Sequence, residues 1–415
     1  MTFNDLNLSK PLLDAIAEAG YTHPTDIQKN AIPLVLNGHD IIGSAQTGTG
    51  KTAAFSVPII QLLAGETTNK IEVLVITPTR ELAIQIGENV RQYGKYTSIK
   101  SAVIFGGVKQ NKQVADLKKG VHILIATPGR LLDLMDQGFI NLNYIKYFVL
   151  DEADRMLDMG FIHDIKRIIS KLPQRRQSLF FSATMPPKIK NLANDILYKP
   201  KHVRVNPVSS TAETITQYLY RTNKNLKHDV LLHLLKTEID EPVLVFSRTK
   251  HGADRISRRL QKARISSGAI HGNKSQNQRQ KVLTDFKKGK VQVLVATDIA
   301  ARGIDIDKLK YVINYDIPNE PETYVHRIGR CGRAGEEGVS FSICEPEENA
   351  YVDDIEALTK EKLSRVSNHP FPQTDKPMSA SEKKAAEKER MKRKQEAIAN
   401  RKRKQANKNQ RGRRR

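Results

Sequence analysis

Short apolar runs recur along most of the chain, separated by segments long enough to form helices. Runs of this length, bounded by turn residues, are typical of strands buried on both faces of a parallel sheet. Strands that alternate with helices predict an α/β fold in which helices cover both faces of the sheet. The first series of predicted strands comprises residues 71–77, 101–105, 121–126, 145–150 and 178–182.

The pattern then starts again, which predicts a second domain of the same class. Between the two series lies a polar segment with a proline, and we predict residues 207–214 to be an interdomain linker. The first domain is expected over residues 1–206 and the second over 215–366. The second series of predicted strands comprises residues 242–247, 267–270, 291–296, 311–315 and 338–343.

The regular pattern ends near residue 366, and we predict a disordered basic tail over residues 367–415. Residues 381–415 contain 16 Lys or Arg and 4 acids, a net charge of +12. Such a segment buries too little apolar surface to offset its ordering entropy. The whole chain carries +23, which favours a polyanionic partner. The tail is expected either to tether a nucleic acid or to act only as a solubilising extension.

Composition excludes several classes of protein. No apolar run approaches the ~20 residues of a membrane span, and the first ten residues lack the basic and apolar regions of a secretory signal. Only two cysteines are present, Cys331 and Cys344, which excludes a disulfide framework and a cysteine-rich zinc site. We therefore expect a cytoplasmic protein that does not contact a membrane.

A loop rich in glycine and threonine, AQTGTGKT at residues 45–52, follows an apolar stretch and precedes a helix-like run. Glycines let such a loop turn its backbone N–H groups toward phosphates. Lys51 is then expected to reach the β- and γ-phosphates of a nucleotide, and the Thr52 hydroxyl to hold Mg²⁺. A simple turn before a helix would leave a similar pattern.

A second motif, FVLDEAD, places acids at the end of a predicted strand. P-loop enzymes present a metal-binding carboxylate beside the nucleotide in this way. Asp151 is expected to hold Mg²⁺ largely through water, and Glu152 to orient or deprotonate the attacking water. Alternatively, Asp151 only caps the following helix.

Together these blocks resemble the DEAD-box family of ATP-dependent RNA helicases, over about residues 3–345, and more narrowly its bacterial RhlE-type branch. The resemblance implies two tandem RecA-like domains that use ATP and Mg²⁺ and bind RNA. Residues 1–29 resemble the adenine-reading block, in which the Gln28 amide pairs with the base. The implied nucleotide-binding residues are Phe3, Tyr21, Thr25, Gln28, Ala45, Gln46, Thr47, Gly48, Thr49, Gly50, Lys51, Thr52, Asp305, Arg330 and Arg333.

The resemblance also implies residues for catalysis, RNA binding and coupling. Lys51, Asp151 and Glu152 are expected to be catalytic, together with two arginine fingers, Arg330 and Arg333. The implied RNA-contacting residues, suited to sugar and phosphate rather than to bases, are Pro78, Thr79, Arg80, Gly106, Gly107, Thr127, Gly129, Arg130, Gln276, Arg279, Thr297 and Arg302. The residues implied to couple hydrolysis to strand separation are Asp154, Ser182, Thr184 and His326.

Two positions depart from the family pattern, Asn273 and Cys331, where the family often has Asp and usually has Thr. The expected function is RNA-stimulated ATP hydrolysis coupled to local, non-processive unwinding of RNA duplexes or remodelling of RNA–protein complexes, in ribosome assembly or RNA decay. The expected partner is RNA with little sequence preference, and we expect a monomer. One alternative is an ATP-gated RNA clamp with little unwinding activity, and another is a DNA helicase or translocase.

Overall fold

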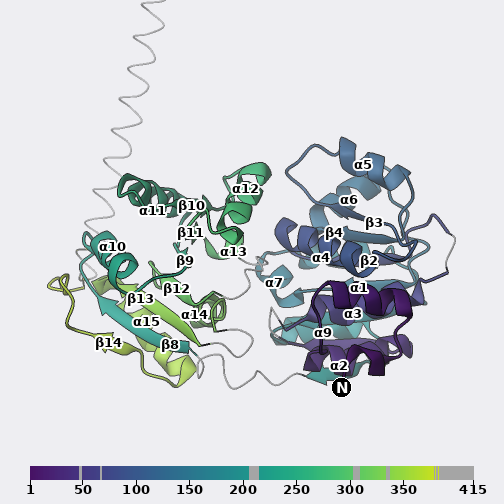
Figure 1. The fold of residues 1–415 in the computed structure, drawn as a ribbon, viewed down its shortest axis with the longest axis horizontal. Helices are drawn as coiled ribbons and strands as arrows, with labels where there is room; N and C mark the ends of the chain where they lie inside the picture. The colour runs from purple at the N-terminus through teal and green to yellow at the C-terminus, as the bar shows by residue number, and fades with distance from the viewer. Residues whose placement is uncertain are drawn as a thin grey trace, which may run out of the picture.

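The chain folds into two lobes, each built around one parallel sheet (Figure 1). The computed structural model describes residues 1–45, 49–65, 68–204, 215–301, 309–332, 337–377, 379 and 382. The predicted linker and residues 383–415 of the predicted tail lie outside these ranges. The predicted α/β fold with two parallel sheets is confirmed.

The first lobe contains a seven-stranded sheet in the order β3-β4-β2-β5-β6-β1-β7. Its strands are β1 (Ile41–Ser44), β2 (Val73–Ile76), β3 (Ser101–Ile104), β4 (Ile123–Ala126), β5 (Tyr147–Leu150), β6 (Gln177–Ser182) and β7 (Lys201–Arg204). Its helices are η1 (Phe3–Leu6), α1 (Lys10–Glu18), α2 (Asp26–Leu36), α3 (Lys51–Leu62), α4 (Arg80–Tyr93), α5 (Asn111–Lys118), α6 (Pro128–Asp136), α7 (Ala153–Asp158), α8 (Ile162–Ile169) and α9 (Pro187–Ile196).

Helices cover both faces of this sheet because successive strand side chains point to opposite faces and both sets are apolar. In β2, Val73 and Val75 pack with the core formed by α1 to α4. Leu74 and Ile76, on the other face, pack with the core formed by α6 to α9. The carboxyl ends of all the strands meet at one edge, where the predicted motifs lie.

The second lobe repeats the plan with the strand order β10-β11-β9-β12-β13-β8-β14. Its strands are β8 (Ile215–Arg221), β9 (Val243–Phe246), β10 (Ser267–Ile270), β11 (Val293–Ala296), β12 (Tyr311–Asn314), β13 (Gly338–Cys344) and β14 (Ser364–Val366). Its helices are α10 (Lys227–Thr237), α11 (Lys250–Lys262), α12 (Gln276–Lys287), α13 (Asp298–Ala301), α14 (Pro321–Ile328), η2 (Pro346–Glu348) and α15 (Asn349–Thr359).

The second lobe continues beyond Val366, although the sequence pattern predicted that the disordered tail starts there. The Asn223 side-chain oxygen accepts hydrogen bonds from the backbone N–H groups of Thr374 and Asp375, both at 2.9 Å. Phe371 packs against the apolar core beside β8 and α10. The segment from 367 to Asp375 therefore belongs to the folded lobe, because one aromatic anchor and one asparagine hold it.

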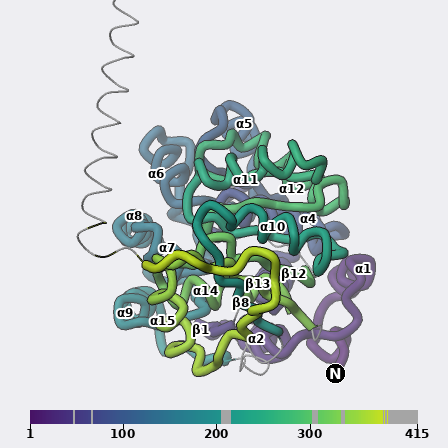
Figure 2. Tube along the Cα trace, turned by 90° about the vertical axis from the view of Figure 1, so that its left-hand side faces the viewer, coloured from purple at the N-terminus to yellow at the C-terminus, as the bar shows by residue number. Residues whose placement is uncertain are grey.

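The two lobes lie side by side, with α12 and α13 of the second lobe facing α4 and α7 of the first (Figure 1). Figure 2 views the molecule from the side of the second lobe and shows α12 in front of α4. Side chains of these two helices touch, as described below. Among the residues that the structure describes, no helix combines the length and the apolar character needed to cross a membrane.

Candidate functional site

The described part of the predicted phosphate loop encloses a buried lysine. Lys51 begins α3, and its Nζ donates a hydrogen bond to the Ala45 carbonyl at 2.9 Å, so the ammonium lies inside the loop. Gly50 has a φ of +91°, and a Cβ there would lie 2.4 Å from the Gln28 Nε2, so the close approach requires glycine. Thr52 follows in the first turn of α3. Gln46, Thr47 and Gly48 lie outside the described residues.

The adenine-reading block packs directly on this loop. The Gln28 Oε1 accepts from the Thr25 backbone N–H at 2.9 Å, and its Nε2 donates to the Gly50 carbonyl at 3.1 Å. The Thr25 hydroxyl donates to the Thr49 carbonyl at 2.8 Å. Tyr21 is exposed, whereas Phe3 is only 5% exposed and packs in the core, which leaves it little surface for stacking on a base.

Two buried acids follow β5 and differ in their electrostatics. Asp151 Oδ1 is buried and has no hydrogen-bond partner among the described residues. Burial raises the pKa of Asp151 to about 6, although the nearby Lys51 opposes the shift. Burial would also raise the pKa of Glu152, but Arg155, Lys51 and Arg330 outweigh it and lower that pKa. Glu152 therefore stays ionised, 3.2 Å from the Arg155 Nη1.

The predicted contact between Asp154 and the Ser182–Thr184 block is present. Asp154 Oδ2 accepts from both the backbone N–H and the hydroxyl of Thr184, each at 2.9 Å. Ser182 Oγ accepts from the Asp154 backbone N–H at 3.2 Å and donates to the Thr184 carbonyl at 2.7 Å. The end of β6 is thereby tied to the start of α7, next to Glu152.

The predicted RNA-contacting residues of the first lobe gather at the carboxyl ends of its strands. They follow β2, β3 and β4, which are adjacent strands. The set comprises Pro78, Thr79, Arg80, Gly106, Gly107, Thr127, Gly129 and Arg130. Among these, Gly107 has a φ of +80°, and a Cβ there would lie 2.3 Å from the Arg80 guanidinium.

Arg130 is held within the first lobe. Its guanidinium donates to the Val108 carbonyl and to the Gln113 Oε1, both at 3.2 Å, and pairs with Asp133 at 3.3 Å. These bonds fix the loop that contains Gly106 and Gly107. Arg130 therefore supports that loop, and its expected contact with RNA stays a prediction.

Gln276 and Arg279, also expected to contact RNA, bind an acid of the first lobe. The Gln276 Nε2 donates to the Glu81 Oε1 at 2.8 Å, and the Arg279 Nη2 lies 2.9 Å from the Glu81 Oε2. The Glu81 and Arg279 side chains are 2% and 11% exposed. Burial lowers the pKa of Arg279 despite Glu81, and the nearby Arg80 lowers it further. No role was predicted for Glu81 from the sequence, although an acid among residues expected to meet an anion was a signal.

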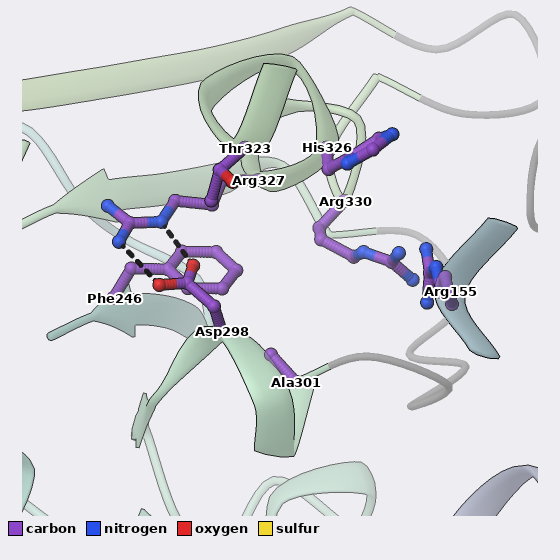
Figure 3. A pocket seen from close by; sticks show the side chains of 8 residues that line it. All are labelled: Arg155, Phe246, Asp298, Ala301, Thr323, His326, Arg327 and Arg330. Carbon is purple, nitrogen blue, oxygen red and sulfur yellow. Dashed lines mark hydrogen bonds and ion pairs between the residues drawn. The ribbon is translucent and has the colours of Figure 1, made fainter. Parts of the chain in front are cut away.

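The predicted arginine finger lies across from the acids. Arg330 is 5% exposed and close enough to Glu152 to lower its pKa. It lines a water-sized cavity of about 20 Å³ with His326 of the same lobe and Arg155 of the first, and points toward Arg155 (Figure 3). Thr297 lies at the end of β11, while Arg302, Asp305 and Arg333 lie outside the described residues.

Arg327 fixes the end of α14, just before the turn that contains Arg330, and no role was predicted for it from the sequence. Its guanidinium donates to both carboxylate oxygens of Asp298, at 2.6 and 2.9 Å (Figure 3). It also donates to the Asp316 carbonyl at 2.6 Å. The neighbouring Cys331 is buried, and its Sγ donates to the Ile328 carbonyl at 3.1 Å. The thiol thus donates the same hydrogen bond that the hydroxyl of the family's usual threonine would donate at this position.

Two family models match this chain: the DEAD/DEAH box helicase model at residues 25–192 and the helicase conserved C-terminal domain model at residues 226–335. ATP-dependent RNA helicase CshA from Limosilactobacillus reuteri is 44% identical over 363 residues, which are 88% of this chain and 73% of the relative. DEAD-box ATP-dependent RNA helicase CshA from Bacillus anthracis is 42% identical over 387 residues, which are 93% of this chain and 72% of the relative.

Solved structures agree in fold. S. cerevisiae Dbp5 bound to RNA and ADP BeF3 is 32% identical with a TM-score of 0.77, and the match covers 88% of this chain and 95% of that one. A DEAD box protein from Methanococcus jannaschii is 41% identical with a TM-score of 0.53, covering 88% and 99%. Dbp5 is the less similar of the two in sequence but has the higher TM-score, and its structure is a complex with RNA and ADP BeF3.

Proposed function

This chain belongs to the DEAD-box family of ATP-dependent RNA helicases, and we propose that it couples ATP hydrolysis to local, non-processive separation of short RNA duplexes. One observation carries the proposal. Arg330 of the second lobe is buried beside Glu152 of the first, so groups needed for phosphoryl transfer come together only when the lobes are docked. The narrower resemblance to the RhlE-type branch stays a prediction.

The first lobe would bind ATP. Lys51 and the backbone of its loop would hold the phosphates, and the Gln28 amide, now bonded to Thr25 and Gly50, would exchange partners to read adenine. Thr52 and Asp151 suit Mg²⁺, because the Asp151 Oδ1 is a buried oxygen with no hydrogen-bond partner among the described residues. When bound there, Mg²⁺ would supply positive charge that neutralises the charge developing on the phosphates.

Glu152 and the arginines would then divide the chemistry. The Glu152 carboxylate, kept ionised by its cationic neighbours, would orient the attacking water and accept its proton. Arg330, with Arg333, would stabilise negative charge on the γ-phosphate, a contribution typically worth ~10³–10⁵ in rate. Because the arginine arrives from the other lobe, hydrolysis would require docking.

RNA would bind along the edge shared by the two lobes. Arg80 of the first lobe, which lies against Gly107, would bind an RNA phosphate, whereas Arg279 of the second lobe is paired with Glu81 and would hold the lobes together. Dbp5 adopts a similar arrangement in its complex with RNA and ADP BeF3, which supports this placement. Since ATP and RNA would both favour docking, each should tighten binding of the other.

We further propose that the helicase acts as a cytoplasmic monomer on ribosomal-precursor or RNA-decay complexes, with contacts to sugar and phosphate giving little sequence preference. Strand displacement from a short RNA duplex tests the proposed function. Displacement should require hydrolysable ATP and disappear in Glu152→Gln. ATP-dependent RNA binding without displacement would instead indicate an RNA clamp, and equal stimulation of the ATPase by single-stranded DNA would argue for a DNA-directed enzyme.

A further inference from the structure

A hollow of about 500 Å³ lies on the first lobe, away from the strands that the predicted RNA-contacting blocks follow. It opens between α9 and the outer edge of the sheet, formed by β1 and β7. The RNA-contacting blocks follow β2, β3 and β4, which lie toward the opposite edge of the same sheet, with β5 and β6 in between. An occupant of the hollow would therefore leave the RNA edge accessible.

The strand register explains why the hollow exists. His202 and Arg204 of β7 lie beside Ile42 and Ser44 of β1 and share their face of the sheet. Helix α9 covers the Ile42 side of this face through Ile189 and its neighbours. The sheet extends one strand beyond the part that α9 covers. On β7, the Val203 side chain is buried on the other face of the sheet, whereas His202 and Arg204 stay exposed on the face of the hollow.

The lining combines an apolar floor with a basic rim. The floor is made by Ile42, Met185, Ala193 and Pro200. The rim carries four basic side chains and no acid: Lys190, Lys199, His202 and Arg204. Charges of one sign around a concave apolar surface attract a ligand of the opposite sign and raise its association rate.

The corner before β7 holds part of this rim in a fixed position. Asp40 Oδ2 accepts from the Tyr198 backbone N–H at 2.8 Å, and the Asp40 carbonyl accepts from the Lys201 N–H at 2.8 Å. Lys199 between them has a φ of +43°, a left-handed conformation, and Tyr198 is 75% exposed. The backbone thus presents Lys199 and an exposed ring beside the hollow.

We propose that this hollow docks an extended acidic peptide from a partner protein. An aliphatic side chain would fill the apolar floor, carboxylates would pair with the rim, and the peptide backbone would run along β7, which pairs only with β1 among the strands that the structure describes. A peptide is favoured over RNA because an aliphatic side chain matches the apolar floor and the outer strand β7 can pair with a peptide backbone. The basic tail of this chain is excluded as the occupant by its own charge.

Docking here would place the partner next to the hydrolytic machinery. Met185 of the floor directly follows Thr184, which binds Asp154, and Ser44 directly precedes the phosphate loop. A bound peptide would therefore contact segments on either side of the nucleotide without entering the cleft between the lobes. The surface suits a partner that positions the helicase on its substrate.

Fluorescence anisotropy tests the proposal with the full-length protein and a short labelled peptide that has a central leucine flanked by aspartates and glutamates. The peptide should bind, and a version with asparagine and glutamine in place of the acids should bind at least about tenfold more weakly. The double variant His202→Glu/Arg204→Glu should lose at least about tenfold in affinity. Lys190→Glu, on the exposed side of α9, should weaken binding in the same direction.

Lys201→Glu is the matched control, because it makes the same charge change as Lys190→Glu and lies on the same strand as His202 and Arg204, but its side chain lies on the other face of the sheet. It should leave peptide affinity within about twofold, since a non-contacting surface charge acts only through solvent. Unchanged RNA-stimulated ATPase in each variant shows that the fold is intact. No binding of the acidic peptide, an equal loss in Lys201→Glu, or displacement of the peptide by oligouridine without nucleotide would overturn the proposal.

Discussion

Breaking the contact between Glu81 and Arg279 should shift the equilibrium between docked and separated lobes. We choose Glu81→Gln, because glutamine keeps an oxygen for the Gln276 Nε2 but removes the charge that faces Arg279. In the docked state the guanidinium would then stay buried without its anion. In the separated state both groups would be hydrated, so the whole cost would fall on docking.

The structure sets the size of the effect. Removing one partner of a fully buried ion pair costs about 3–5 kcal/mol, and the 11% exposure of Arg279 reduces this to about 2–3 kcal/mol. That corresponds to a loss of roughly 30- to 150-fold in the docked population. RNA affinity measured with a non-hydrolysable ATP analogue should fall by this factor, while RNA affinity without nucleotide should hardly change.

The double variant Glu81→Gln/Arg279→Gln separates this role from direct RNA contact. Burial lowers the pKa of Arg279 even with Glu81 beside it, so desolvation of the guanidinium offsets much of the attraction. Replacing both charges should therefore recover most of the ATP-dependent affinity lost in the single variant. If the double variant is as weak as, or weaker than, Glu81→Gln, then Arg279 acts through RNA and the reasoning is refuted.

Three further predictions concern the catalytic acid, a buried histidine and the basic tail. Glu152→Gln should lower ATP turnover by ~10²–10⁴ while ATP-dependent RNA binding persists, and turnover near the wild-type rate in a phosphate-release assay would exclude Glu152 as the catalytic carboxylate. Burial lowers the pKa of His228 from 6.5 to about 4, so the unfolded chain takes up this proton first and stability falls as pH drops from 6.5 to 4. His228→Gln should flatten this fall in thermal melts, and an unchanged pH profile would contradict it. Removing the tail after residue 377 should weaken RNA binding at low salt and flatten its salt dependence, and an unchanged slope would leave the tail as a solubilising extension.

Strands buried on both faces were the most predictable part of the fold. A run such as 121–126 is apolar on both sides, and the structure places β4 inside it. The strands β7, β8 and β14 were not predicted. β7 and β14 lie at sheet edges and expose most of their side chains, and β8 alternates polar with apolar residues, so neither pattern forms a continuous apolar run.

Motif residues were easier to place than their partners. The sequence predicted that Asp154 would bind the Ser182–Thr184 block, and the structure shows that bond. The acceptor for Arg279 was not predictable in the same way, because Glu81 lies 198 positions earlier in the chain and only the docked lobes bring them together. A local pattern marks Glu81 as an unexpected acid, but it does not identify the partner that only the docked lobes bring to it.

In the proposed mechanism, ATP and RNA together hold the two lobes in the docked arrangement. Energy transfer between dyes on cysteines introduced at Lys118 and Lys262, which are exposed on different lobes, measures this most directly, and the two native cysteines are buried. Efficiency should rise only when a non-hydrolysable ATP analogue and oligouridine are both present, and should stay low with either alone. Efficiency that does not change when both are added would contradict the account.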